Sequence, residues 1–376
     1  MRGVAVLGAT GSIGRSALAV VERHRDRFRI VALTARQDAD GLAALAAAWE
    51  PALVVLTDGE AGGRPGWVEG GEGLIAAATH PDVEIVLNAV VGAAGLEASL
   101  AALEAGKRLA LANKESLVAG GPLVMEAARK GGGSLVPVDS EHSAILQCLP
   151  GGSAAGVRRM MLTASGGPFR SRPVEELMEV TPADALRHPT WDMGEKITVD
   201  SATLVNKALE IIEAHYLFDL SYDRLEAVIH PQSVIHSMVE FEDGSVLAQM
   251  GFPTMELPIL YAFTHPERVA DDGTRFDPLT AGPLTFERVD QARYPAFALG
   301  VAAGRRGGTA PAVYNAANEV AVAGFLGGGL RFVDIPVVIE RTLEGCAVRS
   351  LDGLEAVREA DTEARDRASE MIEELT

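Results

Sequence analysis

The N-terminal part of the chain alternates short β-branched or aliphatic runs with longer Ala/Leu-rich stretches. The strand-like runs are residues 3–7, 29–34, 53–56, 84–88 and 108–112, and the helix-like stretches are residues 13–24, 42–49 and 96–105. Strands that alternate with helices form βαβ units, which assemble into a parallel sheet. The sequence therefore predicts an α/β fold in which ligands bind at the carboxyl ends of the strands.

A glycine-rich motif, VAVLGATGSIG, includes the first predicted strand and the loop after it. Gly8, Gly11 and Gly14 lie in this loop, and Ser12 and Ile13 open the next helix. Glycines let the backbone approach a pyrophosphate, and the free N–H groups at a helix start attract the anion. A structural turn could have the same composition, but the place of the motif in a βαβ unit favours dinucleotide binding to a Rossmann-like sheet.

The end of the second predicted strand bears on the choice between NAD and NADP. An acidic residue at this point normally accepts a hydrogen bond from the ribose 2′-hydroxyl of NAD. In this chain Arg36 and Gln37 occupy the position. A guanidinium suits a 2′-phosphate, so the sequence favours NADP, with an exposed turn arginine as the alternative.

The overall charge limits the partners of the chain. Its 376 residues contain 33 Lys and Arg against 52 Asp and Glu, which gives a net charge of −19. Such a surface repels nucleic acid, so any phosphate must be bound locally. No apolar run reaches the roughly 18 residues of a membrane span and no signal-peptide pattern is present, so we expect a cytoplasmic protein without a membrane partner. Cys148 and Cys346 are expected to be buried thiols.

The remainder of the chain is organised differently. An irregular polar segment begins near Gly131, and a predicted hairpin joins residues 233–241 and 245–250. Residues 266–283 are typical of a linker, and helices are predicted at 296–303, 310–326, 335–344 and 351–375. We therefore expect a nucleotide-binding domain at 1–138, a catalytic and metal-binding domain at 139–265, a linker at 266–290 and a C-terminal helical domain at 291–376.

Two polar clusters follow predicted strands. Asn113, Lys114 and Glu115 come after the strand 108–112, where a nicotinamide would arrive, although a solvated helix cap would have the same residues. Asp139 and Glu141, in VDSEH, are two apart in a segment expected to be extended, so both carboxylates would project to one side and share a divalent cation. Carboxylates without Cys or His partners favour Mg²⁺ or Mn²⁺, whereas the N-terminus of a helix at 143–148 is the alternative.

Two further segments have the composition of a phosphate site. Ser165 precedes paired glycines, as in an anion-binding nest, although a plain turn has the same composition. A helix is predicted to begin at Asp200 or Ser201 and to run to about Leu217. On this helix Glu210 shares a face with Asn206 and lies one turn from Lys207, unless Lys207 and Glu210 form only a surface pair.

A Pro- and Gly-bounded loop at residues 187–194 contains Trp191, one of three tryptophans in the chain. Such a loop suits a lid that excludes water during catalysis. The alternative is a loop whose Trp191 packs on the core.

Several longer blocks appear in order along the chain: GATGSIG, LANKESLV, VDSEH, SGGPFR, HPTWDMG, KITVDSATLVNKALE, IHPQSVIHSMV and NAANEVAVAGFL. With these blocks the chain resembles the 1-deoxy-D-xylulose 5-phosphate reductoisomerase family over most of its length. The resemblance implies an NADPH- and divalent-metal-dependent enzyme that makes 2-C-methyl-D-erythritol 4-phosphate for isoprenoid precursors. It also implies an N-terminal NADP domain, a central α+β catalytic domain and a C-terminal helical bundle.

The resemblance assigns site residues by position. The cofactor contacts are Thr10, Gly11, Ser12, Ile13, Ala35, Arg36, Gln37, Asn113, Glu115 and Gly194. The metal ligands are Asp139, Glu141 and Glu210. The substrate contacts are Lys114, Ser140, Glu141, Ser165, His188, Trp191, Ser201, Asn206, Lys207 and Glu210. Lys114, Glu141 and His188 are the candidate catalytic residues, with Lys114 or Glu141 moving the proton and His188 ordering the loop on the phosphate side.

The chain departs from the family pattern at four positions, where Ala9, Ala35, Thr190 and Glu195 replace common Ser, Gly, Asn and basic residues. None of these is a metal ligand. The expected chemistry suits the remaining residues, because a hard cation on Asp139, Glu141 and Glu210 can stabilise the enolate-like charge of a retro-aldol cleavage before NADPH reduces the rearranged aldehyde.

Two other interpretations remain open at this stage. Another NADP-dependent dehydrogenase would need a Cys nucleophile or a different second domain, and Cys148 has no convincing base beside it in the sequence. A nucleotide-sensing regulatory protein would not need three carboxylates and a lid. We also expect a homodimer through residues 228–252, because the predicted hairpin presents a strand edge that needs a partner.

Overall fold

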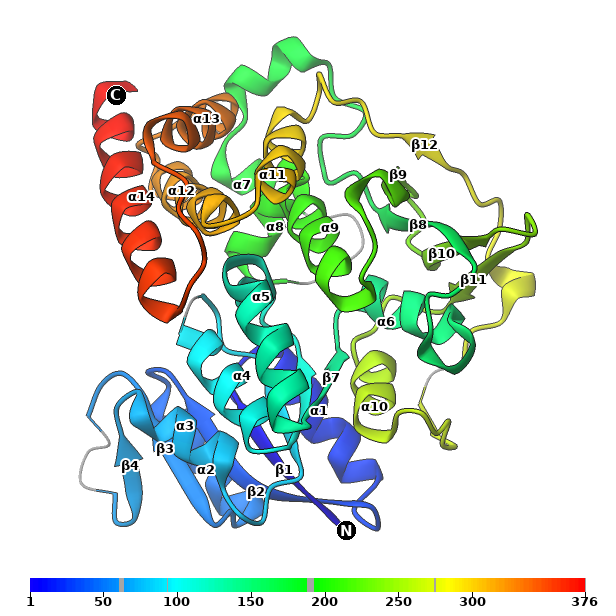
Figure 1. Ribbon diagram of the computed structural model, residues 1–376, viewed down its shortest axis with the longest axis vertical. Coiled ribbons are helices and arrows are strands. Elements are labelled where there is room, and N and C mark those ends of the chain that lie inside the picture. The colour runs from blue at the N-terminus through cyan, green and yellow to red at the C-terminus, as the bar shows by residue number, and fades with distance from the viewer. Residues whose placement is uncertain (61–63, 93, 188–192, 274, 376) are drawn as a thin grey trace. The chain divides into compact units, whose positions relative to one another are not determined.

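The computed structural model describes residues 1–60, 64–92, 94–187, 193–273 and 275–375 (Figure 1). The chain divides into two compact units. The first contains Met1–Leu117, Gly121–Ser143 and Thr254–Thr274, and the second contains Val118–Gly120, Ala144–Pro253 and Arg275–Thr376. The domain boundaries drawn from the sequence stay a prediction.

The first unit contains a seven-stranded sheet in which every pair of neighbours is parallel. Its order is β4-β3-β2-β1-β5-β6-β7. The strands are β1 (Arg2–Leu7), β2 (Phe28–Ala35), β3 (Leu53–Leu56), β4 (Trp67–Glu69), β5 (Ile85–Asn88), β6 (Arg108–Leu111) and β7 (Ser134–Pro137). Strands β1 to β4 follow one another toward one edge of the sheet, whereas β5 to β7 follow one another toward the other edge. The strand order therefore reverses between β1 and β5, which is the point where such sheets bind ligands. The predicted parallel sheet is confirmed.

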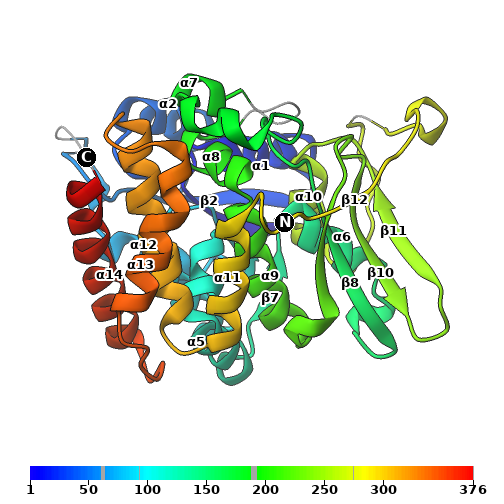
Figure 2. The same ribbon diagram turned by 90° about the horizontal axis from the view of Figure 1, so that it is seen from above.

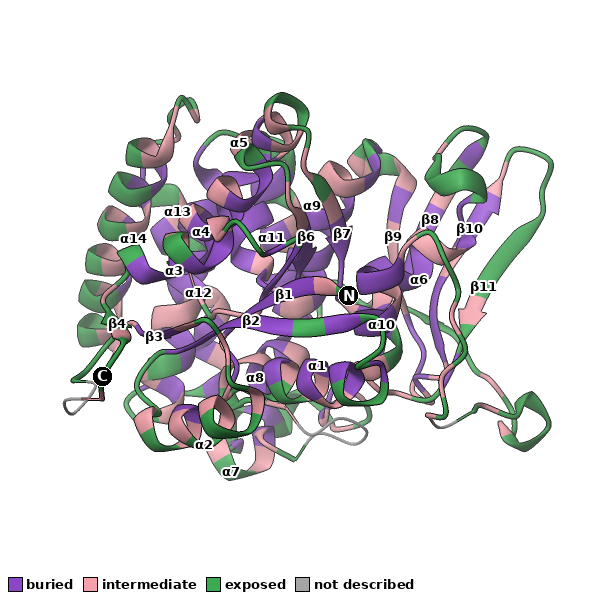
Figure 3. Cartoon of the chain, turned by 90° about the horizontal axis from the view of Figure 1, so that it is seen from below, coloured by how far each residue is buried: buried purple, intermediate pink, exposed green. Residues whose placement is uncertain are grey.

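Helices cover both faces of this sheet, as Figure 3 shows. One face carries α1 (Ser12–Arg23), α2 (Ala39–Trp49) and α10 (Glu256–Thr264), and the other carries α3 (Glu72–Thr79) and α4 (Ala94–Glu104). α5 (Lys114–Gly131) follows β6 and contains Pro122, with non-helical dihedral angles at Gly120. Because both faces are covered, strand residues such as Val4 and Val86 are fully buried, which explains the nearly continuous apolar runs in the sequence.

The second unit contains a mixed sheet of five strands in the order β11-β10-β8-β9-β12. The strands are β8 (Val157–Ala164), β9 (Leu225–Ile229), β10 (Ile235–Phe241), β11 (Val246–Met250) and β12 (Glu287–Arg288). β10 and β11 are antiparallel, so the hairpin expected from the sequence is confirmed. β8 and β9 are parallel, and the loop after β8 carries Ser165.

Helices make up the rest of the second unit. They are α6 (Ser140–Cys148, which begins in the first unit), α7 (Pro182–Ala185), α8 (Glu195–Thr203), α9 (Val205–Phe218), α11 (Pro295–Arg306), α12 (Ala310–Leu326), α13 (Ile335–Gly345) and α14 (Leu354–Leu375). Figure 2 shows α12, α13 and α14 side by side, as their residue contacts also require. The four C-terminal helices lie where the sequence predicted them. Among the residues that the structure describes, no helix is both long and apolar enough to span a bilayer.

Candidate active site

The glycine loop connects β1 with the first turn of α1. Gly14 lies so close to the loop that a Cβ there would come within 2.3 Å of the Gly8 carbonyl oxygen, so no larger residue fits. Gly11 is the N-cap of α1, and among the described residues no side chain caps this helix. Ser12 is exposed, so the first N–H groups of α1 are accessible to an anion. The loop thus has the geometry expected for a pyrophosphate site.

Arg36 lies directly after β2, at the same edge of the sheet. Its guanidinium donates to Asp58 at 3.3 Å, and the Gln37 amide donates to the same carboxylate oxygen at 2.8 Å. The Arg36 side chain is 80% exposed, which leaves its charge available to a bound ligand. An arginine with this exposure fits a 2′-phosphate, because the weak exposed pair with Asp58 can be exchanged for a stronger pair with the doubly charged anion.

Asn113 has a structural function that the sequence left open. Its side-chain oxygen accepts the Ser116 N–H at 2.9 Å, so Asn113 is the N-cap of α5. Its amide donates to the Val90 carbonyl at 2.8 Å and to Glu115 at 2.8 Å. Asn113 is therefore a helix cap, but a buried one rather than the solvated cap of the alternative interpretation, and it fixes the loop after β5 together with the start of α5.

Lys114 lies beside Asp139 within the first unit. The two side chains form an ion pair, and both are largely buried, with exposed fractions of 13% and 15%. His142 is fully buried, and its Nδ1 lies 3.7 Å from Oδ2 of Asp139, the same oxygen that pairs with Lys114. Asp139 thus has a lysine and a histidine beside it at the end of β7.

One detail of the VDSEH motif differs from the prediction of an extended segment. α6 begins at Ser140, so Glu141 lies in its first turn, and the Asp139 carbonyl accepts the Ser143 N–H at 2.8 Å. The Ser140 hydroxyl donates to Glu141 at 2.5 Å. The prediction of an extended backbone is therefore wrong, although a carboxylate oxygen of Asp139 and one of Glu141 still lie within 4.8 Å of each other. The acidic side chains instead benefit from the positive end of the helix dipole.

Within the second unit, the Ser165 loop packs against the end of α8. Gly167 has φ +69°, and a Cβ there would come within 2.8 Å of the Ser201 carbonyl oxygen. The Ser165 hydroxyl accepts the Gly167 N–H at 3.1 Å, and the Tyr294 hydroxyl donates to the Gly166 carbonyl at 2.9 Å. This packing brings the loop of Ser165 beside Ser201, as the phosphate-site interpretation requires.

The predicted single helix that starts at Asp200 or Ser201 is wrong. The structure has two helices, α8 and α9, which meet at Leu204. Leu204 has φ +58° and is the C-cap of α8 and the N-cap of α9 at once. Asp200 and Ser201 are therefore near the end of α8, whereas Asn206 and Lys207 are in the first turn of α9. The break places the end of one helix and the start of the next side by side.

Glu210 and Lys207 form a buried pair on α9, which rules out a surface ion pair. Glu210 is fully buried and the Lys207 side chain is 3% exposed. Lys207 donates to one Glu210 oxygen at 2.5 Å, and Asn206 donates to the other at 2.6 Å. The three predicted residues of this helix thus form one connected group, with a positive charge at a helix N-terminus.

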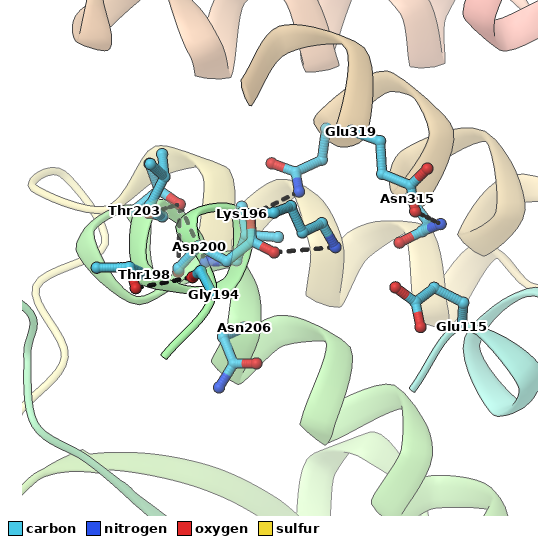
Figure 4. Close-up of polar contacts among 12 residues, drawn as sticks. Glu115, Gly194, Lys196, Thr198, Asp200, Thr203, Asn206, Asn315 and Glu319 are labelled. Carbon is cyan, nitrogen blue, oxygen red and sulfur yellow. Dashed lines mark hydrogen bonds and ion pairs between the residues drawn. The ribbon is translucent and has the colours of Figure 1, made fainter. Parts of the chain in front are cut away.

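The sequence analysis missed a second buried carboxylate nearby. Asp200 is 1% exposed, and Figure 4 shows it joined to Lys196 by a dashed line. Lys196 lies 3.0 Å from one of its oxygens, and the Asn318 amide donates to the other at 2.7 Å. Asn318 belongs to the NAANEVAVAGFL block. The sequence analysis assigned no role to this block, so the block was the only sign of this contact in the sequence.

Gly194 is the N-cap of α8 and is exposed, which suits a cofactor contact through the backbone. His188, Thr190 and Trp191 lie outside the described residues. The assignments of His188 and Trp191, and the lid itself, therefore stay predictions.

A helix-start anion site on a Rossmann-like sheet, together with buried lysine–carboxylate pairs, defines an α/β oxidoreductase of the dinucleotide-binding class. Sequence comparison identifies its family. The family model for 1-deoxy-D-xylulose 5-phosphate reductoisomerase matches residues 4–121, that for the C-terminal domain of this enzyme matches residues 135–218, and that for the DXP reductoisomerase C-terminal domain matches residues 250–367. The chain belongs to the 1-deoxy-D-xylulose 5-phosphate reductoisomerase family.

Relatives of known sequence and solved structures from this family match the chain over nearly its full length. The reductoisomerase of Ralstonia nicotianae is 52% identical over 99% of this chain and 98% of its own. The enzyme of Zymomonas mobilis in complex with NADPH matches with a TM-score of 0.92 at 43% identity, covering 99% of both chains. A reductoisomerase crystal structure in complex with NADPH, fosmidomycin and magnesium also has a TM-score of 0.92, at 38% identity over 100% of this chain and 99% of its own.

Proposed function

We propose that this chain converts 1-deoxy-D-xylulose 5-phosphate into 2-C-methyl-D-erythritol 4-phosphate with NADPH and Mg²⁺ or Mn²⁺, within isoprenoid precursor biosynthesis. The observation that carries the proposal is the buried group of Asn206, Lys207 and Glu210 on α9, in a chain that matches its family from end to end. A lysine and a carboxylate buried together at a helix start suit a site for a phosphorylated substrate and a metal.

Asp139, Glu141 and Glu210 are the proposed metal ligands. The donor set fits a hard divalent cation, because it consists of carboxylate oxygens alone. Lys114 neutralises Asp139 and Lys207 neutralises Glu210, so each of these two carboxylates has a positively charged neighbour. When bound, the divalent ion supplies an electrophile that stabilises negative charge on substrate oxygens.

The proposed substrate phosphate is held within the second unit. Ser165 and Ser201 supply hydroxyl donors, Asn206 supplies an amide, and Lys207 supplies the positive charge. The start of α9 adds its backbone N–H groups to this set. These local donors allow a protein of net charge −19 to bind an anion. We assign Ser140 and the lid residues His188 and Trp191 to the same substrate.

The glycine loop and Arg36 bind the cofactor in this proposal. The N–H groups of Ser12 and Ile13 face the pyrophosphate, and Thr10, Gly11, Ala35, Gln37, Asn113, Glu115 and Gly194 complete the cofactor contacts. Lys114 and Glu141 are the candidates to move the proton, since each combines a titratable group with a position at the carboxyl end of the sheet. His188 is the third candidate catalytic residue.

The test is NADPH oxidation by the purified protein with 1-deoxy-D-xylulose 5-phosphate, with Mg²⁺ or Mn²⁺ and with EDTA. We expect turnover that needs both the sugar phosphate and the metal. Turnover that continues in EDTA would favour a metal-independent NADP dehydrogenase. NADPH binding without turnover on any combination would favour a nucleotide-sensing protein.

Arg36→Asp tests the cofactor assignment. The carboxylate repels a 2′-phosphate and accepts a hydrogen bond from a ribose hydroxyl, so we expect preference to shift from NADPH toward NADH by on the order of 10²-fold in the ratio of kcat/KM values. The measurement is steady-state kinetics with both cofactors. An unchanged ratio would place Arg36 outside the adenosine pocket.

We further propose a homodimer formed through residues 228–252. β11 lies at the edge of the five-stranded sheet and exposes Val246, Leu247 and Met250, with exposed fractions of 49%, 44% and 37%. An edge strand with three exposed apolar side chains favours pairing with another chain. Light scattering should give about twice the mass of 39.5 kDa, and Leu247→Lys should lower it. A wild-type monomer at micromolar concentration would contradict this prediction.

A cytoplasmic location remains part of the proposal.

A further inference from the structure

The helix α8 contains an ion pair between Lys196, which is 27% exposed, and the buried Asp200, and helix stability alone does not explain this pair. Lys196 precedes Asp200 by four residues, so the negative charge is near the C-terminus of the helix. This order is unfavourable, because the helix dipole prefers the acidic residue at the N-terminal side. The reason for the pair must therefore be sought in the residues that contact Asp200 from another helix.

Asn318 of α12 supplies the decisive contact. It is fully buried, and its amide donates to Asp200 at 2.7 Å across 118 positions of sequence. Within the described part of the chain, the Asn318 side-chain oxygen is buried without a hydrogen-bond partner, so the amide is oriented for the carboxylate at the expense of its own oxygen. An Asp buried to this degree is tolerated only with such partners.

A buried tyrosine on the same helix lies within the electrostatic influence of Asp200. Burial, and secondarily the negative charge of Asp200, raises the pKa of Tyr314. The Tyr314 hydroxyl donates to the Ala296 carbonyl of α11 at 3.0 Å. Asp200 is thus enclosed by α12, which is itself fixed to α11. The carboxylate has little freedom to move, and α8 shares this restraint.

Both ends of α8 carry residues of the proposed site. Gly194, at its start, is a proposed cofactor contact, and Ser201 follows Asp200 directly. The helix then passes through Leu204 into α9, so its orientation also sets the positions of Asn206 and Lys207. A rotation of α8 would displace a phosphate donor on each side of this junction.

We infer that Asp200 and Asn318 are positioning residues for the phosphate group of the substrate. Asn318 holds the Asp200 carboxylate, Asp200 holds α8, and α8 presents Ser201 next to the first turn of α9. The NAANEVA motif of the C-terminal helices thereby acquires a role in substrate affinity, although it contributes no proposed substrate contact. This inference rests on the proposed function, since it concerns the same phosphate site.

The experiment compares Asp200→Asn, Asn318→Asp and the double exchange of both residues with the wild-type enzyme. Each single variant places two amides or two carboxylates face to face, whereas the double exchange restores one of each. We expect the KM for 1-deoxy-D-xylulose 5-phosphate to rise by on the order of 10-fold to 10²-fold in each single variant, because small displacements of positioning groups have effects of this size. The double exchange should recover a large part of the loss.

Glu319→Gln is the matched control for loss of stability. Glu319 lies one residue after Asn318 and binds Arg365 of α14 at 2.5 Å, so the change weakens helix packing without touching Asp200. We expect a lowered unfolding temperature in this control with an unchanged substrate KM.

The outcomes separate the inference from the function on which it rests. Wild-type protein without turnover of the sugar phosphate would contradict the proposed function. Wild-type turnover with unchanged substrate KM in both single variants would overturn the positioning role alone. Equal losses in the single variants and no recovery in the double exchange would also overturn it, because a merely destabilised fold shows no pairwise compensation.

Discussion

The variant Glu210→Gln is expected to lose turnover by on the order of 10²-fold or more. The substitution keeps the size of the side chain and most of its helix propensity, so α9 should still form. It removes the negative charge of a fully buried group that we propose as a metal ligand. Loss of one ligand charge weakens binding of a hard cation, and the electrophilic stabilisation that depends on it falls with the cation.

The affinity for NADPH distinguishes this effect from general damage. The glycine loop and Arg36 belong to the first unit, whereas Glu210 belongs to the second, so the Kd for NADPH should hardly change. Mn²⁺ affinity, NADPH affinity and turnover are measured on the same preparation. Glu363→Gln is a suitable control, because it removes a carboxylate on α14 that binds Arg349 at 2.8 Å. Full turnover of Glu210→Gln with unaltered Mn²⁺ affinity would contradict the three-carboxylate site.

The parts of the fold that depend on local sequence were predictable. The glycine loop could be predicted from the spacing of its glycines alone, because the close contact between Gly14 and Gly8 involves only the seven residues from Gly8 to Gly14. The C-terminal helices follow from their periodicity alone. β4 and α3 were missed because β4 has three residues and α3 has eight, which is too short for a clear pattern.

The break at Leu204 shows where sequence patterns cannot decide. A positive φ usually falls on Gly or Asn, and a leucine at this position gives no such signal. The apolar pattern continues through the break, since Leu204, Val205 and Ala208 are all buried in the same core. Tertiary packing of Leu204 therefore stabilises a conformation that its intrinsic preference opposes.

The Asp200 site was missed for a different reason. Its partner Asn318 is 118 positions away, and an isolated sequence carries no sign of which buried carboxylate an asparagine will meet. The prediction of Asp200 as a helix cap used the only local rule that applied to it. By contrast, Asn206, Lys207 and Glu210 were predictable as a group because helical spacing brings them together.

Lys207→Met is the second variant with a large expected effect. Its effect on metal binding should be opposite to that of Glu210→Gln. Methionine fills a similar volume in a position where the lysine is only 3% exposed, but it removes the one cation that we assign to the substrate phosphate. Truncation of one partner in a buried charge contact lowers affinity by about 2–5 kcal/mol. At about 1.4 kcal/mol for each factor of ten, kcat/KM for 1-deoxy-D-xylulose 5-phosphate should fall by roughly 30-fold to 4,000-fold.

Metal binding should respond in the other direction. Lys207 donates to Glu210 at 2.5 Å, so it competes with a divalent cation for that carboxylate. Without the lysine, protein measured in the absence of metal retains a buried Glu210 charge that has lost its lysine partner, which lowers its stability. A cation that binds the folded state should then raise the unfolding temperature more in Lys207→Met than in the wild type.

Thermal unfolding with and without Mn²⁺, combined with substrate kinetics, checks both parts. Lys207→Arg is the matched control, because it keeps the positive charge and should retain more of the substrate affinity than methionine does. If Lys207→Met kept its substrate affinity, the phosphate would have to be bound elsewhere. If Mn²⁺ stabilised Lys207→Met less than the wild type, Lys207 would support metal binding rather than compete with it. The idea that Lys207 and the metal compete for the Glu210 carboxylate would then be wrong.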